Sequence, residues 1–285
     1  MIRLIATDMD GTLLIHGLRG IPKQNLRALK RAKDSGVHVA LCSGRMPEDM
    51  SFYASDAGLQ AHILALNGSY CLDAPHGTCV SDRTMRSEDA MALRRLLDRY
   101  PGLHYAFFGA DELVINAVPS DDWEVNVGTH LRRPGGKTRI ALSLAEGMDR
   151  LLARGVNKLV VVDEAMTGVL EQIRREIARN LPGVEVSSSW CNNLEIMPRG
   201  VNKGAAVQAL AQRLGIPMDQ VMTLGDNEND MPMLACAGVG VAVENATPGA
   251  LAAARYRVAS NECFGVAEAV RRFVLNEGKD GKCGD

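Results

Sequence analysis

Asp8 and Asp10 stand two residues apart at the end of the apolar run that begins the chain, and Gly11 follows them directly. Residues two apart on a strand point to the same side, so both carboxylates can act on one reactant. One carboxylate could attack as a nucleophile while the other donates and accepts a proton. A helix cap or an Asx turn is the alternative, and this short stretch alone leaves both interpretations open.

Two other stretches offer groups that could bind an anion. Leu41–Arg45 supplies the hydroxyl of Ser43 and, at Gly44, a backbone that an anion can approach closely. Lys203 stands at the start of a predicted helix, where an ammonium group and a helix N-terminus both favour an anion. Alone, the Ser43-Gly44 stretch is a weak signal, because Ser-Gly is also an ordinary turn. Alone, the Lys203 stretch is more typical of an exposed lysine.

The stretch Leu224–Leu234 holds the densest group of acids and amides in the chain. Its polar residues, consecutive in sequence, are Asp226, Asn227, Glu228, Asn229 and Asp230. Acids this close repel one another unless water or a cation neutralises them, and oxygen ligands with a phosphate partner suit Mg²⁺. A polar loop with Asn229 or Asp230 as a helix N-cap is the alternative, and the density of acids favours the metal.

The elements that position these residues alternate between strand and helix. We expect strands over Arg3–Thr7, Val37–Cys42 and His62–Leu66, with helices over Pro22–Ser35 and Pro47–Ala57 between them. This order predicts a parallel sheet covered by helices on both faces. Right-handed crossovers bring the carboxyl ends of the strands to one edge, where open sheets bind ligands.

After Asn67 the alternation of strand and helix gives way to a mixture of short strands and helices, and the alternation returns from Leu194. We therefore expect an α/β fold with a Rossmann-like parallel-sheet core and an inserted α+β domain. The predicted boundaries are 1–82 for the first part of the core, 83–189 for the insertion and 190–285 for the second part.

Composition narrows the class of protein. The 32 basic and 34 acidic residues give a net charge of −2, so no basic excess points to nucleic acid or an anionic membrane. No apolar stretch reaches about 18 residues, and the start lacks a signal-peptide pattern. The seven cysteines form no CxxC pair, which suits reduced thiols. We expect a soluble cytoplasmic protein, with its oligomeric state, monomer or dimer, left open.

Taken in order, the motifs DMDGT, CSGR, NKG and GDNENDMPML resemble those of the haloacid dehalogenase superfamily, in its Cof-type sugar-phosphatase branch. The resemblance runs from Asp8 to about Phe273. It implies that Asp8 is a nucleophile that forms an aspartyl-phosphate, and that Asp10 is the acid and base. The residues that it implies for gripping the phosphate are Ser43, Gly44, Lys203 and Asn229.

The resemblance also implies a Mg²⁺ ion, held by the Asp8 carboxylate, the Asp10 backbone carbonyl and the Asp226 carboxylate. Asp230 would support this acidic cluster, and Thr12 would brace the nucleophile loop. Two positions depart from the family's usual pattern. Ser43 replaces a common threonine and keeps the hydroxyl, whereas Glu244 replaces a common glycine and puts the local loop geometry in question.

The inserted domain corresponds to the family's cap, which covers the site and selects the leaving group. Asn67 and Gly68 lie where core and cap meet and could act as a hinge or a contact. Candidate contacts from the cap, each more typical of an exposed loop residue, are Arg132, Arg133, Lys137, Trp190, Asn192 and Asn193.

The function that follows from the motifs is Mg²⁺-dependent hydrolysis of a small phosphomonoester, such as a sugar phosphate, a nucleotide or a cofactor phosphate. A phosphomutase of the same superfamily is the first alternative. A non-catalytic metabolite-binding protein is the second, and the intact pair of Asp8 and Asp10 disfavours it.

Overall fold

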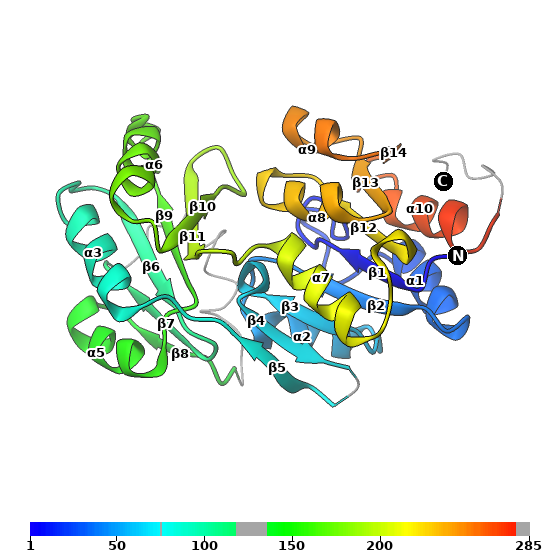
Figure 1. Cartoon of the computed structure of the whole chain (residues 1–285), viewed down its shortest axis with the longest axis horizontal. Coiled ribbons are helices and arrows are strands. Elements are labelled where there is room, and N and C mark those ends of the chain that lie inside the picture. The colour runs from blue at the N-terminus through cyan, green and yellow to red at the C-terminus, as the bar shows by residue number, and fades with distance from the viewer. Residues whose placement is uncertain (75, 118–135, 278–285) are drawn as a thin grey trace. The chain divides into compact units, whose positions relative to one another are not determined.

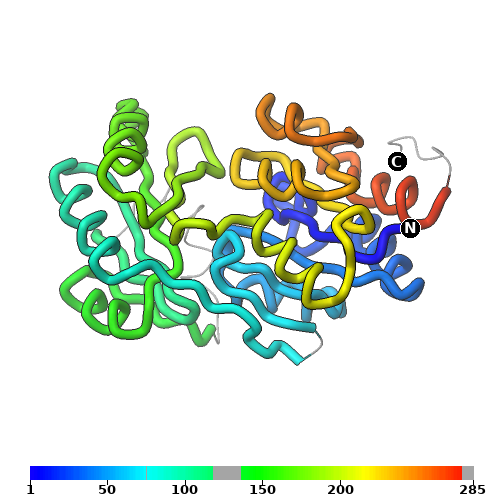
Figure 2. Tube along the Cα trace, in the orientation of Figure 1, coloured from blue at the N-terminus to red at the C-terminus, as the bar shows by residue number. Residues whose placement is uncertain are grey.

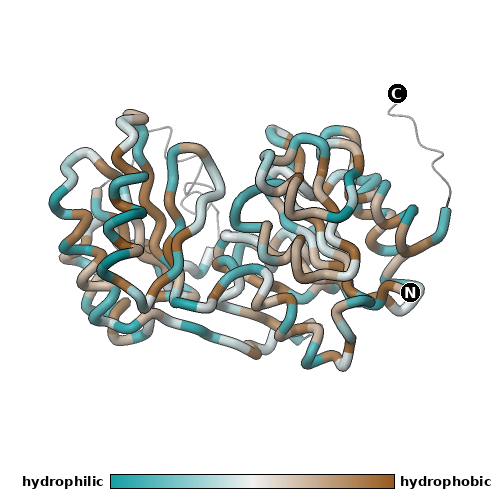
Figure 3. Tube along the Cα trace, turned by 45° about the horizontal axis from the view of Figure 1, so that its top comes forward, coloured by the Kyte–Doolittle hydropathy of each residue, from teal (hydrophilic) through white to brown (hydrophobic). Residues whose placement is uncertain are grey.

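The computed structural model describes residues 1–74, 76–117 and 136–277. The chain divides into two compact units. The first contains Met1–Arg45, Met50–Val80 and the chain from Asn202 onward, and the second contains Met46–Asp49 and Ser81–Val201. Figures 1 and 2 trace both units, and Figure 3 shows hydrophobic residues concentrated in their strands.

The first unit is built on an eight-stranded sheet in the order β14-β13-β12-β1-β2-β3-β4-β5. The pairs from β14 to β3 are all parallel, and β4 returns antiparallel to β3. The strands are β1 (Leu4–Thr7), β2 (His38–Cys42), β3 (His62–Ala65), β4 (Tyr70–Asp73), β5 (Thr78–Asp82), β12 (Val221–Gly225), β13 (Val239–Val243) and β14 (Tyr256–Val258). The expected α/β fold with a parallel sheet is confirmed.

Most of the first unit's helices lie between its strands in sequence, and the last helix follows β14. Its α-helices are α1 (Lys23–Asp34), α2 (Pro47–Asp56), α7 (Lys203–Arg213), α8 (Met231–Cys236), α9 (Pro248–Ala253) and α10 (Gly265–Phe273). Helix α7 packs on the strands through Ala206, Val207 and Leu210, which share a buried cluster with Leu4 and Ala6 of β1. Strands β1 and β12, more than 200 residues apart in sequence, lie side by side (Figure 2). None of the described helices has the length and apolar character needed to span a bilayer.

The second unit has a six-stranded sheet in the order β10-β11-β9-β6-β7-β8. Its strands are β6 (His104–Phe108), β7 (Glu112–Ile115), β8 (Arg139–Ala141), β9 (Lys158–Val162), β10 (Val184–Ser187) and β11 (Asn193–Pro198). Its helices are α3 (Ser87–Leu97), α5 (Leu144–Arg154) and α6 (Val169–Asn180). All three pack on the same sheet face, the one from which Phe107, Leu159 and Ile196 project.

One expectation for the second unit needs correction, and one of its helices was not predicted. The predicted core boundary at 190 is wrong, because β11 pairs between β10 and β9 and keeps the chain in the second unit until Val201. Helix α5 was not expected, although Ser143 caps it by accepting a hydrogen bond from the Glu146 N–H. Strand β11 depends on pairing with distant strands, which the local sequence does not reveal, whereas Ser143 and Glu146 were a local signal for the start of α5.

Candidate active site

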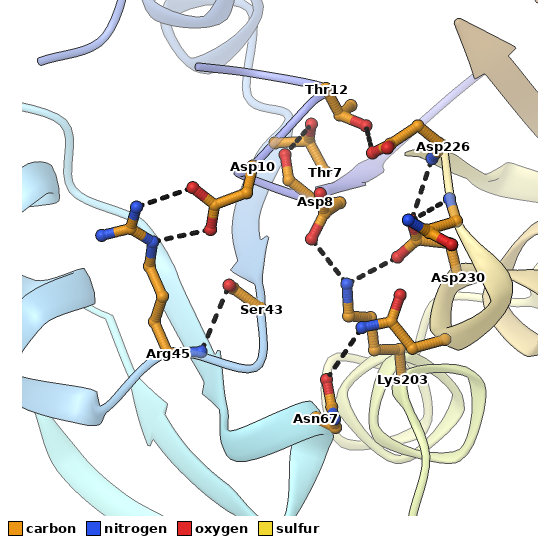
Figure 4. A network of polar contacts seen from close by, with 12 residues as sticks. Thr7, Asp8, Asp10, Thr12, Ser43, Arg45, Asn67, Lys203, Asp226 and Asp230 are labelled. Atoms are coloured by element: carbon orange, nitrogen blue, oxygen red, sulfur yellow. Dashed lines mark hydrogen bonds and ion pairs between the residues drawn. The ribbon is translucent and has the colours of Figure 1, made fainter. Parts of the chain in front are cut away.

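Three parallel neighbours, β2, β1 and β12, end at the same edge of the first unit's sheet. Asp8 directly follows β1, Ser43 follows β2 and Asp226 follows β12. The Asp8 N–H donates to the Leu224 carbonyl at 2.9 Å, so the parallel ladder extends one residue beyond the strand. The sheet thereby gathers side chains that lie far apart in the sequence (Figure 4).

Lys203 joins these strand ends from the N-terminus of α7. Its Nζ donates to Asp8 Oδ1 at 2.5 Å and to Asp230 Oδ1 at 2.6 Å (Figure 4). Asn202 caps the helix by accepting a hydrogen bond from the Ala205 N–H at 2.9 Å, which fixes the point where the lysine leaves the backbone. The lysine is only 1% exposed, and an ammonium so buried is tolerated because carboxylates flank it.

Asp226 and Asp230 are held by a network within their own loop. Asp230 Oδ2 accepts the N–H groups of Asp226 at 2.9 Å and Asn227 at 3.0 Å. The Thr12 hydroxyl donates to Asp226 Oδ1 at 2.6 Å. Thr12 therefore braces the loop after β12 against the loop after β1, and Asp230 fixes the backbone that carries Asp226.

Burial dominates the electrostatics of this cluster. Burial raises the pKa of Asp8 well above its usual value, although the charge of Lys203 opposes the shift. Burial works against the charge of Lys203, but Asp230 and Asp8 outweigh it and raise the lysine pKa. Burial and the charge of Asp230 raise the pKa of Asp226 to about 7. The charge of Lys203 therefore does not offset the effect of burial and of the neighbouring carboxylates on the pKa values of Asp8 and Asp226.

The same cluster has the donor set of a cation site. Asp8, Asp226 and Asp230 each offer a carboxylate oxygen, and these oxygens lie within 4.8 Å of one another. Asp230 already uses one oxygen for Lys203 and the other for two N–H groups. Asp8 and Asp226 each give one oxygen to a donor, Lys203 and Thr12 respectively, and their side chains also lie within hydrogen-bonding reach of each other. Oxygen-only ligands fit a hard cation such as Mg²⁺.

Asp10 does not point its carboxylate into this cluster. Both of its oxygens accept from Arg45, Oδ2 from Nε at 2.7 Å and Oδ1 from Nη2 at 2.6 Å. Ser43 is buried beside them, and its Oγ accepts the Arg45 N–H at 3.3 Å (Figure 4). Gly44 forms the bend between Ser43 and Arg45. The structure thus places Asp8 and Asp10 on the same loop with different partners.

Asn229 is also buried at this edge, where its Nδ2 donates to Asn67 Oδ1 at 3.3 Å. Asn67 has a left-handed backbone, with φ 57°, and its N–H donates to the Ser43 carbonyl at 3.0 Å. Gly68 also has a positive φ, and a Cβ there would lie 2.5 Å from the Ala206 Cβ. Asn67 is thus hydrogen-bonded within the first unit, and the backbone of Gly68 lies too close to α7 for a side chain.

Sequence reasoning assigned no role to two residues of this edge, Arg45 and Asn245. The Asn245 Nδ2 donates to the Gly11 carbonyl at 2.8 Å, and its Oδ1 accepts the Asn261 N–H at 2.9 Å. Glu244 is exposed in the turn after β13, so its side chain does not displace this brace. A polar residue just after a strand, as Asn245 is after β13, was the feature of the sequence that could have indicated this role.

The residues expected to contact a leaving group belong to the second unit. Arg132 and Arg133 lie outside the described residues. The Lys137 N–H donates to Glu48 at 2.6 Å. Trp190 is 57% exposed on a turn in which Asn193 Oδ1 accepts the N–H groups of Ser189 and Trp190. Asn192 is partly exposed on the same turn, and the roles of these residues stay predictions.

Gly11→Ala is expected to destabilise the protein more than Gly17→Ala. Both glycines have a φ near +78°, a conformation that costs an alanine about 1–2 kcal/mol. A Cβ at Gly11 would also lie 2.6 Å from Asp226 Oδ2, whereas nothing lies within 4 Å of one at Gly17. Thermal unfolding measures the loss of stability in each variant, and the difference between the two losses reports the clash with Asp226. Equal losses of stability would contradict the predicted clash.

Comparisons with known proteins agree with this geometry. The model of the haloacid dehalogenase-like hydrolase family matches residues 5–270. The 5-amino-6-(5-phospho-D-ribitylamino)uracil phosphatase of Bacillus subtilis is 29% identical, with 96% of each chain covered. The HMP-PP phosphatase of Cronobacter sakazakii is 32% identical over 88% of each chain. A haloacid dehalogenase-like hydrolase from B. subtilis shares the fold, with a TM-score of 0.83 and 22% identity over 95% of this chain and all of that one.

The match over nearly the whole chain confirms the resemblance that the four motifs carry. The relatives are phosphatases, and the aspartates and the lysine of those motifs meet at one sheet edge. We conclude that the chain belongs to the haloacid dehalogenase-like hydrolases and is a phosphatase of that family.

Proposed function

We propose that this phosphatase hydrolyses a small phosphomonoester through an aspartyl-phosphate on Asp8, with a bound Mg²⁺ ion. The observation that carries the proposal is the contact of Asp8 with Lys203, beside a carboxylate oxygen of Asp226. A buried carboxylate next to a lysine and a candidate cation site can approach a phosphate dianion, which would otherwise repel it.

In the first step an Asp8 oxygen attacks phosphorus, and the bond from phosphorus to the leaving oxygen breaks. Asp10 gives its proton to that oxygen, so the leaving group departs as a neutral alcohol. Lys203, the Ser43 hydroxyl, the Gly44 N–H and Asn229 would hold the phosphoryl oxygens. In the second step water attacks phosphorus, its proton returns to Asp10, and Asp8 is released as a carboxylate together with inorganic phosphate.

The Asp8 and Asp226 carboxylates, together with the Asp10 backbone carbonyl, would hold the ion. When bound, Mg²⁺ supplies charge neutralisation for the phosphoryl group and for the carboxylates that approach it. Asp230 would act on this site indirectly, through the backbone N–H groups of Asp226 and Asn227. Thr12 would keep one Asp226 oxygen in place and leave the other for the ion.

Mg²⁺ affinity is expected to rise with pH between pH 5.5 and about 7. The reason is that the Asp226 pKa of about 7 leaves the carboxyl protonated at lower pH, where the ion must displace the proton. Because the folded pKa exceeds the ordinary 3.8, this group stabilises the metal-free fold at low pH, and its contribution disappears as the pH rises through 7.

Calorimetric titration of the metal-free protein with Mg²⁺ at several pH values, from 5.5 to 8.5, measures this dependence. Asp226→Asn is the matched control, and it should bind the ion weakly at every pH. An affinity for Mg²⁺ that stays constant between pH 5.5 and 7 in the parent protein would contradict the assignment.

The substrate class proposed is a small phosphorylated metabolite: a sugar phosphate, a nucleotide or a cofactor phosphate. The relatives support this range, since one is named for a phosphoribitylamino-uracil and another for HMP-PP. The deciding experiment is a phosphate-release screen with Mg²⁺ over hexose phosphates, nucleotides, pyridoxal phosphate and FMN, ranked by kcat/KM. Isomerisation of a hexose 1-phosphate without free phosphate would instead show a phosphomutase, and no release from any compound would refute the proposal.

A further inference from the structure

The pair formed by Arg45 and Asp10 has the geometry of a clamp. Two hydrogen bonds of 2.7 and 2.6 Å join different nitrogens of the guanidinium to different oxygens of the carboxylate. A fork of this kind fixes the plane of the carboxylate as well as its distance. A lysine in this place could supply a charge but not the fork.

The clamp matters because the Asp10 side chain is otherwise poorly confined. Its side chain is 44% exposed, whereas that of Asp8 is 6% exposed. An exposed carboxylate on a turn samples several rotamers, and proton transfer needs it near the leaving oxygen. Arg45 is the residue to which the structure ties both Asp10 oxygens.

Arg45 is itself held along its whole length. Its N–H donates to the Ser43 hydroxyl, and its carbonyl accepts the Leu66 N–H at 3.0 Å. Its guanidinium carbon lies 5.1 Å from the centre of the Tyr53 ring, on α2. The side chain is 17% exposed, so the arginine is a rigid support and not a solvated surface charge.

We propose that Arg45 is a positioning residue that acts through Asp10, fixing the carboxylate for proton transfer to the leaving oxygen and from water. This inference rests on the proposed function, because it gives Arg45 a part in the aspartyl-phosphate reaction. It extends that function to the loop between β2 and α2, whose arginine holds the acid and base of the reaction by both oxygens.

A double-mutant cycle tests whether Arg45 acts through Asp10. Arg45→Ala in the parent protein should lower kcat about 100-fold, within the usual range for a positioned acid or base. The same change in an Asp10→Asn background should lower kcat less than about threefold, because the group that Arg45 positions is already gone. If the fold-loss of kcat in the double variant equals the product of the losses in the two single variants, the proposal is overturned.

Comparing the effect on kcat with the effect on binding distinguishes a residue that positions Asp10 from one that contacts the substrate. Arg45→Ala should change KM and the inhibition constant of inorganic phosphate less than about threefold. Arg45→Lys should recover less than about a tenth of the lost kcat, because the lysine lacks the fork. A tenfold weakening of phosphate inhibition with unchanged kcat would make Arg45 a phosphate ligand and overturn the proposal.

A burst experiment with p-nitrophenyl phosphate adds a second readout. Its leaving group needs no acid, so Arg45→Ala should release about one equivalent of p-nitrophenolate quickly. Turnover should then be slow, because hydrolysis of the aspartyl-phosphate still needs a correctly placed base. A variant that loses the burst and the steady-state rate together would contradict a role through Asp10.

Arg86→Ala is the matched control. Arg86 holds Asp89 with the same fork, at 2.8 and 2.9 Å, but lies in the second unit. The kcat of Arg86→Ala should stay within about twofold of the parent. Thermal unfolding of Arg86→Ala and Arg45→Ala checks that both variants fold. If the parent protein releases no phosphate, the proposed function fails. If the parent is active and Arg45→Ala matches it, only this inference fails.

Discussion

Asp8→Asn is expected to abolish phosphate release, with kcat reduced at least about 10⁴-fold. An amide in place of the carboxylate cannot form the aspartyl-phosphate, which is the intermediate of the proposed reaction. The fold should survive, because the amide oxygen can still accept the Lys203 hydrogen bond and Lys203 keeps Asp230. Thermal unfolding in EDTA should show unchanged or higher stability, since burial already disfavours the Asp8 charge and raises its pKa.

The matched control for this prediction is Asp89→Asn. Asp89 is also a buried aspartate with a cationic partner, Arg86, but lies in the second unit. This variant should keep kcat within about threefold of the parent, whatever stability it loses. Activity of Asp8→Asn within tenfold of the parent would refute the nucleophile assignment.

The sequence predicted the place of the site because parallel strands leave little freedom at their ends. The strands expected before Asp8 and Ser43 belong to one parallel sheet, so their carboxyl ends had to meet at one edge. The pairing of β12 with β1, which brings Asp226 to the same edge, comes from the structure. Lys203 could be added because the start of a helix is readable from sequence. Residue type and the alternation of strands with helices therefore carried most of the prediction.

The partner of each side chain was not predictable in the same way. Asp10 was expected beside Asp8, yet its carboxylate turns to Arg45, whereas Lys203 bridges Asp8 and Asp230. These choices depend on rotamers and on competition among charges within a few ångströms. No spacing in the sequence encodes them.

The boundary of the inserted domain failed for a related reason. Residues 193–198 alternate little and are buried throughout, so they fit a strand in either sheet. Only the pairing of β11 with β9 and β10 assigns the segment to the second unit. Pairing between distant strands is a tertiary property, and a single sequence gives no direct signal of it.

Lys203→Met is expected to lower the free energy of unfolding by about 3–5 kcal/mol at pH 8 in EDTA. Methionine keeps most of the aliphatic stem but removes the charge, which leaves the buried Asp8 and Asp230 carboxylates facing each other. Phosphate release should also fall at least about 100-fold, since the lysine would hold the phosphoryl group. Chemical denaturation measures the first effect and the phosphate assay the second.

The pH dependence identifies the cause of the loss of stability. Burial raises the pKa of Asp8 in the parent protein, and removing Lys203, which opposes that shift, should raise it further. A carboxyl with a raised pKa stabilises the fold when protonated, so the deficit of Lys203→Met should shrink as the pH falls from 8 to 5.5. A deficit that is the same at both pH values would indicate lost packing instead.

Lys158→Met provides the comparison within the same chain. Lys158 is buried to a similar degree and forms an ion pair with the buried Glu195 at 3.0 Å. The structure gives Lys158 an ion pair with Glu195 and a contact with the Phe108 ring, whereas Lys203 is held between two carboxylates that repel each other. The loss of stability should therefore be smaller for Lys158→Met and should leave phosphate affinity unchanged. A larger loss for Lys158→Met would show that repulsion between Asp8 and Asp230 is not the main cause of the instability of Lys203→Met.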